Sequence, residues 1–352
     1  MKTVTSALLC LWASTALPQA DSSKKCSDIL RLNGYIKNMQ MLSFDNELRD
    51  IVNDNLIHNR LNFRCYPIKN TEIALELRNR IFTGESVDAN PAYGDMADVD
   101  NGYVDMSWLL LDKPSLVFLT QIDRAWAEWA KGQWEIRAGR QRINWGANTF
   151  WNSNDLFNAY SLVDFDYEEL PGADALRIHR FFGDMSGLDL AVQPGKSASQ
   201  WVAAGRYHFN KWQYDFQLIG AWWHEDVALG AGWAGNAGNA GFKGEATWFQ
   251  PQEQLTDTTG VLSASISADY VFPNELYLTL GALFNSGGID TAMQYAQNIM
   301  MEPLTAKNLM PTKYSVILNM MYPATPLLNC SFMLLYAPGV NLAFAMPSLS
   351  YS

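Results

Sequence analysis

Polar and apolar side chains alternate with a period of two over much of the chain, which indicates β-strands. Two such segments flank a tight turn at residues 67–70 and predict a β-hairpin with one strongly polar and one apolar face. The polar face of this hairpin carries His58, Arg60, Asn62, Arg64, Glu72, Glu76, Arg78 and Arg80. A later segment has the same alternation, with Lys243, Glu245 and Thr247 on one face and Phe242, Ala246 and Trp248 on the other.

The number of such segments predicts roughly 16 strands, within a range of about 14 to 18, because boundaries read from sequence drift by several residues. Short turns alternate with long loops, which we expect at residues 84–102, 147–173 and 285–311. No linker and no shift in composition marks a second domain. We therefore expect residues 21–352 to form a single domain.

An antiparallel sheet with one apolar face is compatible with two architectures. In a soluble sandwich the apolar faces pack inward, whereas in a transmembrane barrel they face lipid. The strands are about ten residues long, the length that a tilted membrane-spanning strand needs. Aromatic residues stand near predicted strand ends, where membrane interfaces place them: Trp129, Trp134, Trp201, Trp222, Trp248 and Tyr270. These features predict an all-β fold, a transmembrane antiparallel β-barrel.

The N-terminus has the features of a secretory signal. Lys2 gives a positive start, and residues 7–16 form an apolar run that is too short to span a bilayer. We therefore expect residues 1–20 to be a signal peptide and the bacterial outer membrane to be the destination. No later segment predicts a transmembrane helix.

Composition narrows the choice of partners. Charged residues make up 17% of the chain and apolar residues 48%, a balance that suits contact with a lipid bilayer. The net charge of -11 disfavours nucleic acid as a partner. We expect small polar solutes as partners and no cofactor, and the sequence leaves the oligomeric state open.

The C-terminal end departs from the usual pattern of bacterial barrels, which finish on a strand with a terminal aromatic residue. This sequence stops at Tyr351 and Ser352, soon after Pro347. We expect that it lacks a final strand or closes in an unusual way.

Arginines on the polar faces are the first candidates for a functional surface. A bulge at Gly139 would bring Arg137, Arg140 and Arg142 onto one face. In a narrow lumen such a basic ladder would attract anions; alternatively, the arginines pair with Glu72, Glu76, Glu135 and loop carboxylates and brace the wall. The predicted pore-lining residues are Arg60, Arg64, Arg78, Arg80, Arg137, Arg140, Arg142, Glu72 and Glu76.

The loop at residues 147–173 is rich in aromatic and acidic side chains. If it folds inward, it would narrow the pore and place acids opposite the arginines. The alternative is an extracellular loop packed on itself. The predicted constriction residues are Trp151, Asp155, Tyr160, Asp164, Asp166, Glu168 and Glu169.

The four histidines, His58, His179, His208 and His224, show no sequence spacing typical of metal ligands. None has a serine two residues later, as a simple nucleophile–base pair on one strand would require. The sequence therefore predicts no metal site and no enzyme.

Three motifs give a resemblance to a known group of proteins. They are GRQRINWG at 139–146, NKWQYDF at 210–216 and GEATWFQP at 244–251. With these motifs the chain resembles porin-like outer-membrane proteins of Bacteroidota-type bacteria. The resemblance implies an outer-membrane barrel, and it identifies no substrate.

Taken together, the signal, the strands and the resemblance predict a porin-like channel for small polar solutes, with a preference for anions. The alternatives are a secreted or outer-membrane β-protein with a binding, adhesion or structural role, and an outer-membrane hydrolase, which the histidine pattern disfavours.

Overall fold

The computed structural model describes residues 29–44, 51–100, 102–158, 171–254, 260–291 and 304–351. In this part of the chain the fold is all-β, with 17 strands in one sheet, and the predicted fold class is confirmed. The strands are β1 (Leu30–Phe44), β2 (Ile51–Cys65), β3 (Thr71–Gly84), β4 (Ser107–Lys113), β5 (Leu116–Lys131), β6 (Trp134–Gln141), β7 (Ala173–Gly183), β8 (Ser186–Gln193), β9 (Val202–Lys211), β10 (Tyr214–Trp223), β11 (Asp226–Ala237), β12 (Ala240–Pro251), β13 (Val261–Val271), β14 (Tyr277–Asn285), β15 (Tyr314–Pro323), β16 (Leu328–Ala337) and β17 (Leu342–Tyr351). The predicted signal peptide at residues 1–20 lies outside the described residues.

The hairpin read from the alternating pattern is present. β2 and β3 pair antiparallel, with Arg60 opposite Arg78 and Asn62 opposite Glu76. β2 begins at Ile51, seven residues before His58, the first residue of the polar face read from the sequence. The loop expected at 84–102 contains two short helices, α2 (Glu85–Ala89) and α3 (Tyr93–Ala97).

One strand, β4, was not predicted, and its pairing decides how many strand positions lie around the barrel. β5 pairs with β3 along most of its length. On its other side, residues 116–121 of β5 pair with β4 and residues 125–131 pair with β6. β4 and β6 therefore share one position, and the 17 strands occupy sixteen positions around the sheet.

The two faces of the sheet have the polarity of a membrane barrel. Apolar side chains stand exposed on the outer face, as with Leu218 (55% exposed) and Leu229 (62%). Thr247, Ser263 and Thr279 are fully buried on the opposite face. A soluble sandwich would bury the apolar face and expose the polar one, so the observed pattern agrees with the barrel and not with the sandwich.

Exposed tryptophans flank the apolar band on both sides. Trp129 and Trp134 lie beside the short turn between β5 and β6, and Trp222 and Trp248 lie near the opposite ends of β10 and β12. Amphipathic indole rings favour the two water–lipid interfaces of a membrane. The distribution therefore matches the interface positions predicted from sequence.

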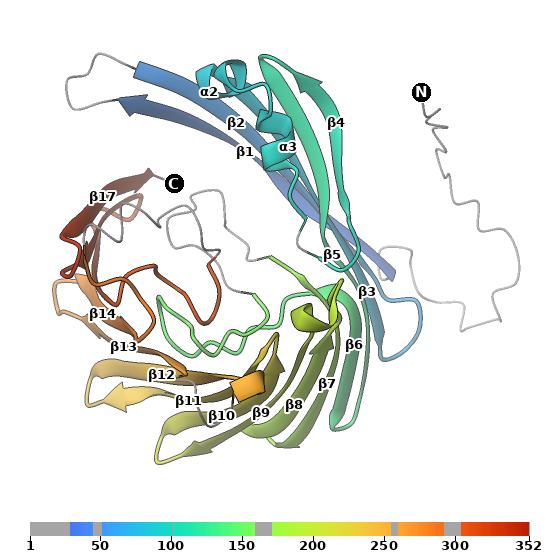
Figure 1. The fold of residues 1–352 in the computed structure, drawn as a ribbon, viewed down its shortest axis with the longest axis vertical. Helices are drawn as coiled ribbons and strands as arrows, with labels where there is room; N and C mark the ends of the chain where they lie inside the picture. The colour runs from blue at the N-terminus through green and yellow to red at the C-terminus, as the bar shows by residue number, and fades with distance from the viewer. Residues whose placement is uncertain are drawn as a thin grey trace, which may run out of the picture.

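The sheet curves round an interior that other parts of the chain enter. Figure 1 shows β5 to β17 following one continuous arc, while β1 and β2 splay away from it. Within the described residues β1 pairs with β2 alone and β17 with β16 alone, so that β1 and β17 form the two edges. Residues 142–158, which follow β6, run inside the arc. None of the helices in the described ranges is long and apolar enough to cross a membrane.

Candidate functional site: the interior of the barrel

The segment 142–158, which follows β6, is buried inside the barrel. Trp145, Trp151 and Asp155 are 1%, 2% and 2% exposed. The Trp145 and Phe157 rings pack edge to face with their centroids 5.2 Å apart. Two of the predicted constriction residues, Trp151 and Asp155, thus lie within the barrel interior. The other predicted constriction residues, Tyr160, Asp164, Asp166, Glu168 and Glu169, lie outside the described residues.

A buried carboxylate on β12 holds the backbone of this segment. Glu245 is 1% exposed and accepts hydrogen bonds from the N–H groups of Ala147 at 2.9 Å and Asn154 at 3.3 Å. The neighbouring inward residue, Thr247, donates its hydroxyl to the carbonyl oxygen of Ser153 at 2.9 Å. An irregular segment inside a protein needs such partners for its backbone groups, and the polar face of β12 provides them.

Two nearby strands, β10 and β13, add further hydrogen bonds. Gln217 on β10 donates to the carbonyl oxygen of Trp145 at 2.7 Å. Ser265 on β13 donates to the carbonyl oxygen of Trp151 at 2.7 Å and accepts from the Asn148 amide, also at 2.7 Å. The segment is thus fixed against β10 to β13, and it occupies that side of the interior.

Asp155 is the buried ionisable group of the segment. Burial, the largest cause, and the nearby charge of Glu245 together raise the pKa of Asp155 to about 8, although a backbone hydrogen bond from Trp145 and the charges of Arg142 and Arg206 act in the opposite direction. A carboxyl group in this position is therefore mostly neutral at pH 7.

The opposite side of the interior is lined with arginine–carboxylate pairs. Arg60 is 1% exposed and contacts Glu76 at 2.6 Å and Asp123 at 2.5 Å. Arg64 contacts Glu76 at 2.5 Å and Glu72 at 3.3 Å. These contacts join β2, β3 and β5 across their inner faces, as the bracing alternative expects.

Arg78 and Arg80 continue this row along β3. Arg78 is 6% exposed, donates to Gln121 at 2.7 Å and lies 3.4 Å from Asp123. The Arg80 guanidinium lies over the ring of Phe82, 5.4 Å from its centroid.

Arg140 forms a second buried network at the end of β6. Its side chain is 3% exposed and contacts Asp174 at 2.8 Å and Asp100 at 2.6 Å. Burial would raise the pKa of Asp100, but hydrogen bonds from Arg140 and from the N–H groups of Met106 and Gly102 outweigh it and hold that pKa below its ordinary value.

The irregularity predicted at Gly139 takes a different form from the one expected. The pairing of β6 with β5 and β7 is continuous through Gly139, and the register shift lies in β5, where Asp123 is the extra residue between the partners of Glu76 and Leu77. Gly139 has φ 113°, and a Cβ there would lie 2.2 Å from the carbonyl oxygen of Ala125, so only glycine fits. The extra residue, Asp123, directs its carboxylate at Arg60 and Arg78.

Arg137 and Arg142, the remaining candidates, differ from Arg140. Arg137 forms an ion pair with Glu128 and lies 3.5 Å from Glu135. Arg142 is exposed and forms no ion pair with another residue of the described ranges. The arginines proposed as one ladder are therefore of two kinds, several held by carboxylates and one, Arg142, exposed.

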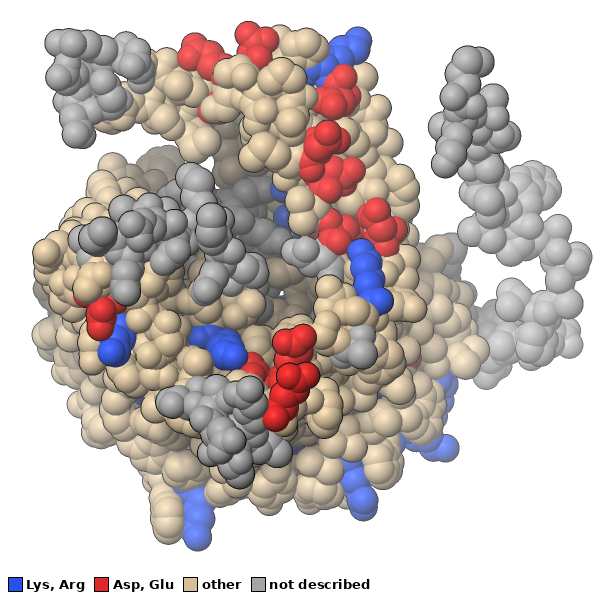
Figure 2. Space-filling view, in the orientation of Figure 1, with Lys and Arg blue, Asp and Glu red and all other residues tan. Residues whose placement is uncertain are grey.

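A cavity of about 350 Å³ lies between the charged wall and the inward segment. Arg78, Asp123, Arg140 and Asp100 line it from the wall, and Phe157 lines it from the segment. Figure 2 shows the hollow end of the molecule, with acidic side chains gathered over α2, α3 and β4 beside it.

Sequence reasoning missed the strand carboxylates that pair with the arginines. They are Asp123, Glu128, Asp174 and Asp189. Each stands on a strand that reads as largely apolar, and a charged residue within such a strand is a signal that alternation could have shown. Their partners depend on which strands are neighbours, and that information appears only in the fold.

No protein-family model matches the chain, and no curated protein matches it. Among solved structures, it is similar to OmpF of Salmonella typhi, solved in complex with daunomycin, with a TM-score of 0.50, 10% identity, and coverage of 92% of this chain and 97% of that one. It is also similar to a triple mutant of the Rhodopseudomonas blastica porin, with a TM-score of 0.50, 9% identity, and coverage of 92% and 99%. At these identities the likeness establishes the fold alone, and that fold is a porin-like β-barrel.

Proposed function

We propose that this chain is an outer-membrane channel through which small polar solutes diffuse. The observation that carries the proposal is the 350 Å³ cavity, which lies inside an apolar-faced barrel between a wall of ionised side chains and an inward segment. A polar interior suits water and polar solutes, and the apolar outer face suits lipid. The porin-like fold and the resemblance to Bacteroidota-type porin-like proteins support the same assignment.

In this proposal the segment 142–158 narrows the passage. It is fixed to β10–β13 by Glu245, Gln217 and Ser265, so solutes would pass on the side of β3 and β6. There the guanidinium groups of Arg78 and Arg140 stand near the carboxylates of Asp123 and Asp100. Ion pairs that line a narrow, low-dielectric space create a local field that orients polar solutes.

A preference for anions is a second part of the proposal. Arg142 supports it, because its guanidinium is exposed and arginine keeps its charge at any working pH. The carboxylates that pair with Arg60, Arg64, Arg137 and Arg140 offset much of the remaining positive charge. We therefore expect a modest anion preference.

Swelling of liposomes that contain the refolded protein, measured with a size series of neutral sugars, tests the channel. Phe157→Leu enlarges the cavity and should admit larger sugars. Phe249→Leu is the matched control, because Phe249 is buried in the same apolar cluster and does not line the cavity. Absence of swelling with every solute would instead favour a binding or structural barrel.

A further inference from the structure

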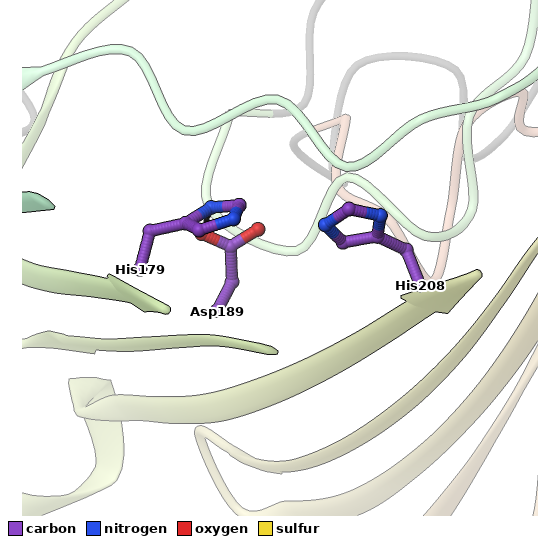
Figure 3. A group of neighbouring side chains, drawn as sticks. All are labelled: His179, Asp189 and His208. Carbon is purple, nitrogen blue, oxygen red and sulfur yellow. Dashed lines mark hydrogen bonds and ion pairs between the residues drawn. The ribbon is translucent and has the colours of Figure 1, made fainter. Parts of the chain in front are cut away.

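Three side chains on adjacent strands form a compact group on the inner face of the sheet. His179 lies on β7, Asp189 on β8 and His208 on β9, and one potential ligand atom from each lies within 4.8 Å of the others. Figure 3 shows all three projecting to the same side of the sheet, with His179 against Asp189 and His208 facing them. None of the three residues lines the cavity, and the channel proposal does not use the group.

The hydrogen bond between His179 and Asp189 defines which nitrogen of this ring is available. Nδ1 of His179 lies 2.7 Å from Oδ1 of Asp189, and an ionised carboxylate only accepts hydrogen bonds. Nδ1 therefore carries the proton, and in the neutral ring Nε2 keeps its lone pair. A carboxylate that orients a histidine through its other ring nitrogen is the usual support of a metal ligand.

Both Nε2 atoms lack a partner and converge on one point. The Nε2 atoms of His179 and His208 are buried and have no hydrogen-bond partner among the described residues. His179 is 6% exposed. A Cβ placed on Gly187 would lie 2.7 Å from the first Nε2 and 2.8 Å from the second. The absence of a side chain at Gly187 thus leaves room beside these two unpartnered Nε2 atoms.

The surrounding charges do not oppose a cation, although arginines are near. Arg177 and Arg206 both bind Asp189, and Arg177 also lies 3.8 Å from Glu135. Glu135 and Glu128 in turn hold Arg137. Three arginines therefore face three carboxylates, and the network beside the histidines is neutral. The Phe181 ring stacks on His179 with the centroids 4.0 Å apart and limits its rotation.

We propose that His179 and His208 bind one divalent transition-metal ion, such as Zn²⁺ or Cu²⁺, through their Nε2 atoms, with Asp189 as the positioning residue and water completing the coordination. Imidazole is a preferred ligand of these ions. β7 and β8 meet at one short turn, and β9 and β10 meet at another. The ion would therefore lie inside the barrel near its short-turn end.

The test uses the refolded full chain in detergent. Titration with Zn²⁺ alone, followed by calorimetry, should give one site per chain, and Cu²⁺ should give an electron paramagnetic resonance spectrum with coupling to two imidazole nitrogens. His179→Gln and His208→Gln should each abolish this site. Asp189→Asn should weaken binding by about 10-fold to 100-fold, the usual loss for a residue that orients a metal ligand.

Two further variants separate the site from a general effect of histidines or of folding. Gly187→Ala should weaken binding, because the new methyl group forces the two Nε2 atoms apart. His224→Asn should leave binding unchanged, since His224 lies in a turn with φ 55°, a conformation that Asn tolerates. Heat-modifiable migration shows that each variant is folded. Folded protein that binds no Zn²⁺, or that binds it equally after both histidine substitutions, would overturn the proposal.

Discussion

The carboxylate of Glu245 accepts a hydrogen bond from the backbone N–H of Ala147 at 2.9 Å, although 98 positions separate the two residues. The bond links the wall of the barrel to the segment that fills part of its interior. Glu245 also accepts from the N–H of Asn154, so one side chain holds the buried segment at two points that lie seven residues apart. The position of the segment therefore depends strongly on this residue.

Glu245→Gln should loosen the segment, because an amide replaces one acceptor oxygen with a donor that faces an N–H group. We expect a loss of about 1–3 kcal/mol in the free energy of unfolding and a higher, noisier conductance in planar bilayers. Glu72→Gln is the control, since Glu72 is half-buried and its one ion pair within the described residues is with Arg64, at 3.3 Å. Equal effects of the two substitutions would contradict the role given to Glu245.

The stability of the barrel should depend on pH through Asp155. Its pKa in the folded protein, about 8, is raised above the ordinary 3.8, so the folded state binds this proton more tightly than the unfolded state. The stabilisation is complete below about pH 4, declines as the pH rises and is lost above about pH 8. Between pH 6 and pH 9 the unfolding temperature should therefore fall.

Asp155→Asn provides the control for this effect, because an amide cannot lose a proton in this range. The variant should show a smaller fall in unfolding temperature between pH 6 and pH 9, measured by heat-modifiable migration in detergent. A wild-type protein that is more stable at pH 9 than at pH 6 would show that Asp155 is not held neutral inside the barrel.

Arg140→Ala and Arg142→Ala should have opposite consequences. The first removes a buried cation and leaves Asp100 and Asp174 without their partner, which costs about 3–5 kcal/mol of stability. The second removes an exposed guanidinium and should leave stability unchanged while shifting the reversal potential in a salt gradient towards cations. Anion preference that survives both substitutions would show that neither arginine controls selectivity.

Leu218→Arg tests whether the exposed apolar face meets lipid. Leu218 is 55% exposed in the middle of β10, and arginine near the bilayer midplane costs about 2–4 kcal/mol. Ile68→Arg, in a short turn where the side chain is 68% exposed, should be neutral. In a soluble protein both changes would stay within about 0.5 kcal/mol, and that result would exclude a lipid-facing wall. Refolding yield into bilayers and the free energy of unfolding are the measurements.

Much of the barrel wall can be predicted from the sequence, because each strand has one face towards lipid and one towards the polar interior. The alternation around Arg60 and Arg78 predicts the β2–β3 hairpin, and the alternation around Glu245 places that residue on the inner face. β4 was missed because its sequence, SWLLLDK, is short and lacks clear alternation. The helices α2 and α3 have only five residues each, which is too few for a helical period to show.

The ion pairs of the interior are harder to predict from the sequence, because each joins residues that are far apart in the chain. Arg140 was recognised as a candidate, but Asp174 reaches it only through the pairing of β6 with β7. The group of His179, Asp189 and His208 shows the same limit, since its members meet across three strands. A search for histidines spaced along one element cannot find this group. The sequence does show that Arg177 and His179, and likewise Arg206 and His208, are two residues apart and so share one face of a strand.

The sharing of one position by β4 and β6 has a consequence for the seam of the barrel. Sixteen is an even number, so β1 and β17 run in opposite directions at the two edges. Their unpaired N–H and C=O groups therefore have the polarity needed for an antiparallel ladder of the kind that joins every other pair in the wall. In hydrocarbon, where water cannot satisfy such groups, a ladder of this kind is the favoured outcome. The wall can thus close if the β1–β2 hairpin moves towards β17 and β1 pairs with it. This closure reverses no strand and leaves the topology unchanged.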